Sequence, residues 1–166
     1  MTIGFALIFI LTRARMGCIY TTMTDVRKAA ARASRECVAY RCRQLGREVT
    51  RLYDEALREN DLTVAQFSLL GAIALQEPIQ AVELGRALGI EKSTLSRNLK
   101  RLKQAGWTAH IEKGGKMGLV LTGAGQQIFL NAFPAWQSAQ ATIHRNLGKN
   151  AAITLDQLIR GLKNGK

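Results

Sequence analysis

Residues 84–99 read Leu84-Gly85-Arg86-Ala87-Leu88-Gly89-Ile90-Glu91-Lys92-Ser93-Thr94-Leu95-Ser96-Arg97-Asn98-Leu99, and this stretch decides the fold. Two helices that cross steeply need a small residue at their contact and a residue in the turn that tolerates a left-handed backbone. Gly85 and Gly89 fill these two positions. The spacing also supplies the apolar residues that pack the helices together, namely Leu84, Leu88, Ile90, Leu95 and Leu99. The stretch therefore predicts a helix-turn-helix.

A β-hairpin is expected directly after this motif. The first helix should run from about Gln80 to Leu88, and the second from near Ser93 to Gln104, before Gly106. The apolar period then changes, which predicts two short strands at Trp107–Ile111 and Leu119–Leu121 around a glycine-rich turn. A hairpin in this position is the wing of a winged helix-turn-helix.

Amphipathic helices are expected on the N-terminal side of the motif. Apolar residues recur at three- and four-residue steps from about Cys37 to Arg58, after a loose charged lead-in at Asp25–Glu36. Thr63 is expected to cap a second helix over Val64–Leu75.

The C-terminal side is also expected to be helical. Thr122 should cap a long helix to about Asn146, with a kink or a new turn at Pro134, and a last helix should cover Thr154 to Leu162. The predicted fold class is mainly α with a small β-hairpin wing: a winged helix-turn-helix plus a helical dimerisation region.

The charge of the chain indicates a polyanionic partner. The sequence has 24 Lys and Arg against 12 Asp and Glu, a formal net charge of +12. Between Pro78 and Thr122, eight cations face three acids, a surplus of five in the predicted motif itself. Double-stranded DNA is the first candidate, while a solvated basic surface or attraction to an anionic membrane are the alternatives.

The second helix of the motif and the wing carry the predicted DNA contacts. Short hydroxyls can donate to or accept from base edges, and cations can bind phosphate or guanine. The candidates are Lys92, Ser93, Thr94, Ser96, Arg97, Lys100 and Arg101 on the helix, and Lys113 and Lys116 in the wing. The competing interpretation of the wing residues is a plain surface turn.

Four parts are expected along the chain. Residues 1–24 form an upstream extension or disordered N-terminus, 25–62 an N-terminal dimerisation helix region, 63–122 the DNA-binding domain and 123–166 C-terminal dimerisation helices. The apolar run Ile3–Leu11 is too short to span a bilayer, and the favoured interpretation places it upstream of the true start, at Met16 or Met23. A weak membrane-surface anchor is the alternative to this interpretation.

Cysteines and aromatic residues offer two further candidate sites. Three cysteines without disulfide-scaffold density suggest a reduced cytoplasmic setting. Cys37 and Cys42 are candidates for redox sensing, against the commoner role of a buried free cysteine. The candidates for an effector pocket are Tyr53, Phe67 and Trp136, although such aromatics more often belong to a core.

Catalysis finds little support in the sequence. His110 and His144 are the only histidines and have no metal-ligand spacing, and no phosphate loop, Gly-x-Ser-x-Gly element or paired-carboxylate constellation is present. We therefore expect no enzyme activity, no cofactor and no metal.

Several segments together resemble the multiple-antibiotic-resistance regulator (MarR) family. They are Arg51-Leu-Tyr-Asp, Leu62 through Leu70, Leu84 through Leu102, Gly106-Trp107 and Leu121-Thr122-Gly-Ala-Gly125, and the match spans about Cys37 to Asn146. The sequence departs from the family pattern in the wing. Family wings usually carry Asp-x-Arg before the Leu-Thr, whereas this short wing offers Lys116, a point charge in place of a bidentate contact.

The resemblance implies a homodimer whose terminal helices interleave and whose two winged helices bind successive major grooves of a pseudo-palindrome. It also implies a repressor, relieved by a small ligand or by thiol oxidation. The alternative function is a non-specific DNA-binding or protein-interaction module that has kept the fold.

Overall fold

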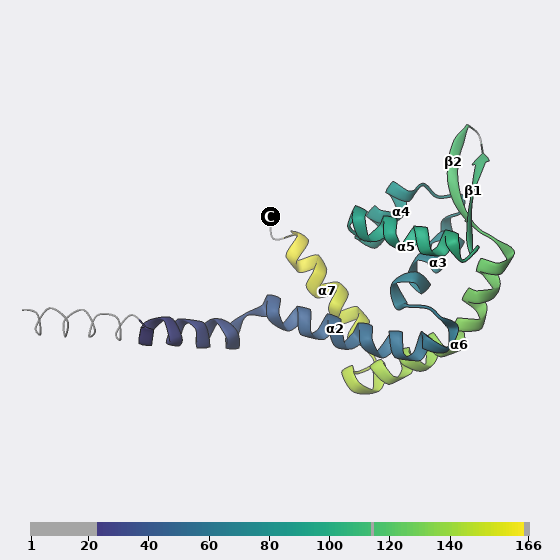
Figure 1. Ribbon diagram of the computed structural model, residues 1–166. Coiled ribbons are helices and arrows are strands. Elements are labelled where there is room, and N and C mark those ends of the chain that lie inside the picture. Colours follow the sequence, from purple (N-terminus) through teal and green to yellow (C-terminus); the bar gives the residue numbers. More distant parts are fainter. Residues whose placement is uncertain (1–22, 114, 165–166) are drawn as a thin grey trace, which may run out of the picture. The chain divides into compact units, whose positions relative to one another are not determined.

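The computed structural model describes residues 23–113 and 115–164, and the apolar run Ile3–Leu11 lies outside them. The chain divides into two units, residues 1–47 and 48–166. The elements after the first helical stretch are α2 (Val38–Leu57), the short 3-10 helix η1 (Arg58–Asn60), α3 (Val64–Gln76), α4 (Ala81–Leu88), α5 (Lys92–Gln104), β1 (Thr108–Lys113), β2 (Lys116–Leu121), α6 (Gly123–Leu147) and α7 (Ala151–Asn164) (Figure 1). The structure is therefore mainly α with one antiparallel hairpin, as the sequence predicts.

Residues 23–36 are helical, so the prediction of a loose lead-in at Asp25–Glu36 was wrong. This stretch is rich in alanine, the best helix former, and Arg32 forms an ion pair at 3.0 Å with Glu36 one turn further along. The helix is interrupted at Cys37, although the backbone N–H of Cys37 still donates to the carbonyl of Ala33 at 3.0 Å.

The predicted caps of α3 and α6 are confirmed. Thr63 and Gln66 form a capping box at the start of α3, and the Thr122 hydroxyl accepts from the N–H of Gly125 at 3.0 Å. Asp54 adds a second polar contact at α3, because its carboxylate accepts from the N–H of Val64 at 2.7 Å. The first turns of both helices are therefore satisfied by side chains.

One apolar core joins α3, α4, α5, β2 and α6. Leu57, Leu69, Leu70, Ile73, Leu84 and Leu102 are its largest fully buried side chains. Most of this core is aliphatic, which fits a chain with few aromatic residues. The core fixes the helix-turn-helix against α3 and the base of the hairpin.

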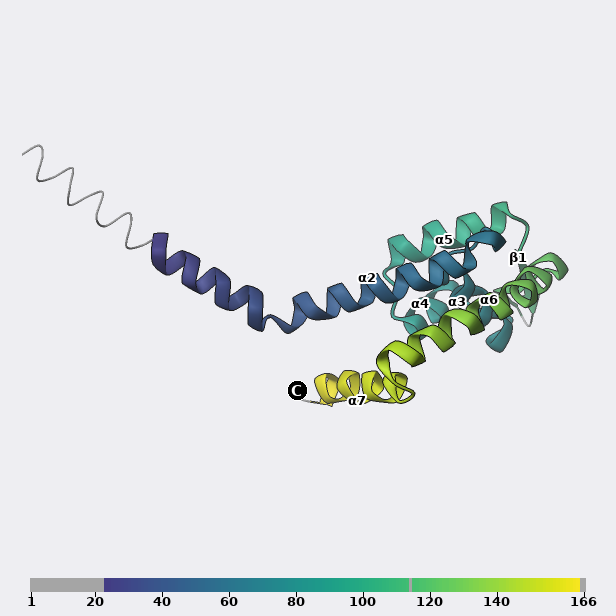
Figure 2. The same cartoon turned by 90° about the horizontal axis from the view of Figure 1, so that it is seen from below.

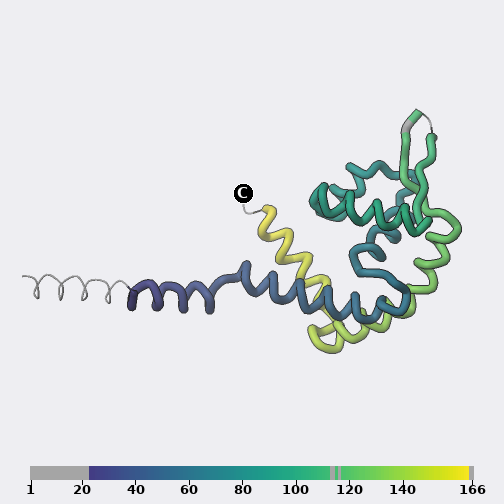
Figure 3. Tube along the Cα trace, in the orientation of Figure 1, coloured from purple at the N-terminus to yellow at the C-terminus, as the bar shows by residue number. Residues whose placement is uncertain are grey.

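α6 agrees with the sequence prediction, whereas α7 begins earlier than predicted. Pro134 lies inside α6, and Figure 3 shows that α6 changes direction along its length, as a proline that lacks an N–H predicts. α7 starts three residues before the predicted Thr154, and no residue of α7 is buried.

None of the helices among the described residues is long and apolar enough to cross a membrane.

The start of α6 lies against the end of the helix-turn-helix through Gly125. A Cβ atom placed on Gly125 would lie 1.9 Å from the carbonyl oxygen of Trp107, a backbone atom that cannot move aside. We expect Gly125→Ala to lower the free energy of unfolding by about 2–4 kcal/mol, measured by urea denaturation.

Gly123→Ala is the matched control, because nothing lies within 4 Å of a Cβ at Gly123. It should be neutral or stabilise the protein by up to about 1 kcal/mol, since alanine favours helix. Equal stability of the two variants would contradict the contact.

Candidate nucleic-acid interface

α5 is held in place by a close contact with α4. A Cβ atom on Gly85 would lie 3.0 Å from Cδ2 of Leu95, so the small residue permits the approach of the two helices. Gly89 has φ 62° and ψ 32° and ends α4 in the left-handed conformation. Both glycine roles expected from the sequence are confirmed.

The inner and outer faces of α5 differ in chemistry. Leu95 and Leu102 are buried in the core, and Asn98 and Leu99 are half-buried. In Figure 2, α5 lies at the edge of the group formed by α3, α4 and α5. Of the predicted contacts on this helix, Thr94 is half-buried and the exposed ones are Lys92, Ser93, Ser96, Arg97, Lys100 and Arg101.

Arg97 lies back along the first turn of α5. Its Nε donates to the carbonyl of Ser93 at 3.3 Å, and its Nη2 donates to the Thr94 hydroxyl at 3.4 Å. Both bonds are longer than a usual N–H···O bond, so exchanging them for a ligand acceptor costs little. Asn98 instead donates to the carbonyl of Thr94 at 3.0 Å and faces the helix itself.

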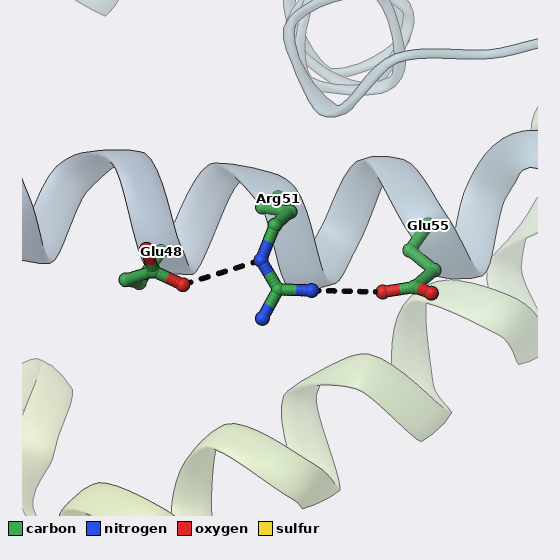
Figure 4. Close-up of polar contacts among 3 residues, drawn as sticks. All are labelled: Glu48, Arg51 and Glu55. Carbon is green, nitrogen blue, oxygen red and sulfur yellow. Dashed lines mark hydrogen bonds and ion pairs between the residues drawn. The ribbon is translucent and has the colours of Figure 1, made fainter.

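The positive charge of α5 is not neutralised by acids of its own. α5 contains five Lys and Arg and no Asp or Glu. Among the described residues, the ion pairs join Arg32 to Glu36 and Arg51 to both Glu48 and Glu55, the latter two at 3.2 and 3.1 Å (Figure 4). The cations of α5 take part in none of these pairs, so the helix presents its full charge to a polyanion.

The hairpin is longer and its turn tighter than the sequence predicts. β1 and β2 pair from Thr108 with Leu121 out to Lys113 with Lys116, and Gly115 has φ +73° in the turn. Backbone pairing needs no side-chain pattern, so the glycine-rich stretch extends the ladder. The backbones of Lys113 and Lys116 thus face each other at the tip, and their side chains lie outside the described part of the structure.

A segment between α3 and α4 fixes the base of the wing. Ile79 pairs with Leu119 through two backbone bonds of 3.1 and 2.8 Å, and the Glu77 carboxylate accepts from the N–H of Leu121 at 2.8 Å. A Cβ atom on Gly118 would lie 2.7 Å from Cβ of Pro78, so only glycine fits between them. Sequence reasoning missed Glu77, whose partner lies 44 residues away.

The three predicted effector-pocket residues come together as a packed aromatic cluster. Phe67 lies between Phe129, at 4.6 Å between ring centroids, and Trp136, at 6.0 Å, and Tyr53 stacks on Trp136 at 6.4 Å. The Tyr53 hydroxyl hydrogen-bonds to Gln140, and burial raises the pKa of Tyr53. These contacts resemble a core more than the wall of a pocket.

A cavity that the sequence did not predict lies between α4 and α5. Its volume is about 740 Å³, and apolar side chains of Val82, Ile90 and Leu95 line it beside the charged residues Arg86, Glu91 and Lys92. A lining of apolar and charged side chains suits a small ligand that has both apolar and polar groups.

Two of the three cysteines lie within the residues that the structure describes. Cys37 and Cys42 are both exposed free thiols, so neither is the buried small hydrophobe of the alternative interpretation. Within residues 23–113 and 115–164, no group of three or more His, Cys, Asp or Glu is placed to hold a metal.

The steep helix pair, the hairpin and the basic outer face of α5 define a winged helix-turn-helix protein. A family model described as the MarR family matches residues 60–110. The multiple antibiotic resistance protein MarR of Escherichia coli (strain K12) is 31% identical over 114 residues, covering 66% of this chain and 79% of that protein.

Solved structures of transcriptional regulators are also similar to this chain. The M. tuberculosis transcriptional regulator MosR in complex with DNA is 30% identical with a TM-score of 0.66, covering 77% of this chain and 98% of that one. The oxidised form of MarR from E. coli is 26% identical with a TM-score of 0.61, covering 75% and 93%.

This chain belongs to the MarR family of DNA-binding transcriptional regulators. It is a transcription regulator and not an enzyme.

The Glu77 contact gives a test of how the wing is held. Glu77→Ala leaves the buried Leu121 N–H without its acceptor, so we expect a loss of about 1–3 kcal/mol in the free energy of unfolding. Amide hydrogen exchange at Leu121 should also become faster. Glu77→Gln keeps a carbonyl oxygen in reach and should retain most of the stability; identical exchange in all three proteins would rule the contact out.

Proposed function

We propose that the chain is a repressor that binds a pseudo-palindromic operator as a homodimer, in the cytoplasm. The outer face of α5 carries the proposal, because its exposed hydroxyls and cations have the chemistry that base edges and phosphates require. The proposed contacts are the residues predicted from the sequence on α5 and in the wing. The relative MosR, crystallised with DNA, supports duplex DNA as the partner.

The proposed dimerisation contacts lie within residues 25–62 and 123–166, outside the DNA-binding domain, and need not involve every residue of these ranges. In α7, Leu155, Leu158, Ile159 and Leu162 recur at helical steps and are all exposed in the single chain. Leu162 leaves 80% of its surface exposed, which is costly for an apolar residue without a partner. A second copy of the chain is the partner we propose for this stripe.

Selection of bound sequences from random duplex DNA tests the proposal as a whole. A dimer should recover a pseudo-palindrome with half-sites about one helical turn apart, at near-physiological salt. Binding that shows no preferred sequence and collapses as salt rises would favour the second candidate function, a non-specific DNA-binding module. The features that favour this second candidate are the net charge of +12 and a wing that offers Lys116 in place of the Asp-x-Arg element of the family pattern.

Arg97 gives the sharpest single-residue test. We expect Arg97→Ala to weaken operator binding by about 1–3 kcal/mol, because arginine binds guanine through two hydrogen bonds. Binding to unrelated duplex should change much less, and gel shift on both duplexes measures the difference.

Arg58→Ala serves as the control, because Arg58 is exposed and lies in η1, outside the helix-turn-helix. It should bind both duplexes like the natural protein. Equal losses on operator and unrelated duplex for Arg97→Ala would make Arg97 a phosphate contact instead.

We further propose that a small ligand or thiol oxidation relieves repression. The exposure of Cys37 and Cys42 supports the oxidation route, and so does the existence of an oxidised form of the relative from E. coli. For a ligand, the cavity between α4 and α5 is a better receptacle than the packed cluster of Tyr53, Phe67 and Trp136.

Peroxide treatment separates these routes. The natural protein should lose operator binding on oxidation, whereas Cys37→Ser, Cys42→Ser or both should keep it, as gel shift with and without reductant would measure. Cys18, the third cysteine of the sequence, remains in all three variants and controls for thiols elsewhere. An unchanged response in the double variant would remove Cys37 and Cys42 from the mechanism.

A further inference from the structure

The first helical stretch carries a dense set of cations that the winged helix-turn-helix does not use. Arg27, Lys28, Arg32 and Arg35 lie within residues 23–36, and every described residue of that stretch is exposed. Over residues 23–47, seven Lys and Arg face two acids, a surplus of five. This surplus equals that of the winged helix-turn-helix itself, in about half as many residues.

These cations share one face of the helix. At about 100° per residue, Lys28, Arg32 and Arg35 stand at positions i, i+4 and i+7, and Arg27 lies next to Lys28, all within an arc of about 140°. Of the two acids, Glu36 is paired with Arg32 at 3.0 Å, between side chains that are 75% and 63% exposed. Such an exposed pair is weak and easily exchanged for another anion.

The opposite face of this helix is not suited to binding a membrane surface. Val26, Ala29, Ala30 and Ala33 occupy it, so it offers small side chains with little apolar area. Helices that lie in a membrane surface instead present large apolar residues such as Trp, Phe and Leu opposite their cations. Three of the four cations are arginines, whose planar guanidinium matches the geometry of phosphate.

We propose that this basic face binds the phosphate backbone of duplex DNA without regard to sequence, in addition to the operator contacts of α5. The inference rests on the proposed function in one respect, since it takes duplex DNA as the working partner. From Arg27 to Arg35 the cations extend about 12 Å along the helix axis, long enough to meet several consecutive phosphates. The contact adds affinity and salt dependence but no sequence preference.

The test compares two variants of the full chain that lose the same charge. One replaces Arg27, Lys28, Arg32 and Arg35 by glutamine. The matched control replaces Arg145, Lys149, Arg160 and Lys163 by glutamine, four exposed cations near the other end of the chain. Because these four lie in the proposed dimerisation region, size-exclusion chromatography first verifies that both variants keep the oligomeric state of the natural protein. The readout is the slope of log affinity against log salt on a duplex without operator, between about 50 and 200 mM.

We expect the first variant to lower the slope by about 2–4 for each bound protomer, because each phosphate contact contributes about 0.9. Its affinity at the lower salt should fall at least tenfold, while the ratio of operator to unrelated binding stays the same. The control should change the slope by less than about 0.9, the contribution of one phosphate contact. Equal changes in both variants would reduce the effect to net charge and overturn the proposal, as would an unchanged slope in the first variant.

A lysine variant and a vesicle-binding assay test two alternative explanations, helix damage and membrane binding. Replacing Arg27, Arg32 and Arg35 by lysine keeps the charge and should keep the slope, and loss of the slope here would mean that helix damage is the cause. Vesicles of equal parts phosphatidylserine and phosphatidylcholine test the membrane alternative. Vesicle binding that the glutamine variant abolishes, with DNA binding untouched, would overturn the proposal.

The proposal and the proposed function fail in different ways. If selection finds no preferred sequence while the glutamine variant still lowers the slope, operator binding is contradicted and phosphate binding by the basic face is supported. If an operator is found and the slope does not change, phosphate binding by the basic face is contradicted and operator binding is supported.

Discussion

The contact between Gly85 and Leu95 is the constraint on which the DNA-binding surface depends. Because glycine lets Leu95 approach to 3.0 Å of a Cβ position, α4 and α5 cross closely and bury Leu84, Leu95 and Leu102 in one core. This packing turns the other face of α5 outward, with its five cations and no acid. The chemistry of that face is therefore a direct consequence of apolar packing on the inner side.

Polar contacts between distant segments hold the surroundings of this helix pair. Glu77 and Ile79 fix the base of the wing, and Asp54 caps α3. Each of these contacts satisfies a backbone N–H that would otherwise lose its partner at the end of an element. The carboxylates of Glu77 and Asp54 are therefore structural.

Two separate parts of the chain carry the largest surpluses of positive charge. The winged helix-turn-helix and residues 23–47 each carry a surplus of five cations, although only the first has the shape to enter a groove. The acids that lie on α2, Glu48 and Glu55, are engaged by Arg51 (Figure 4). A division between a shape-specific surface and a purely electrostatic one would let the same protein find DNA quickly and then choose a sequence.

The sequence by itself determined the family, the order of elements from α2 onward, the caps at Thr63 and Thr122, and the left-handed turn at Gly89. These depend on residues close together in the chain, where spacing alone fixes the geometry. Tertiary structure alone decided the Glu77 contact, the fit of Gly118 against Pro78, the full length of the hairpin and the cavity between α4 and α5. Each of these depends on which distant segments of the chain come into contact, and the local periodicity of the sequence does not predict such contacts. The helix over residues 23–36 is a different case. Its alanines and the Arg32–Glu36 pair favour a helix and are visible in the sequence, but the stretch lacks the apolar stripe by which the other helices were predicted.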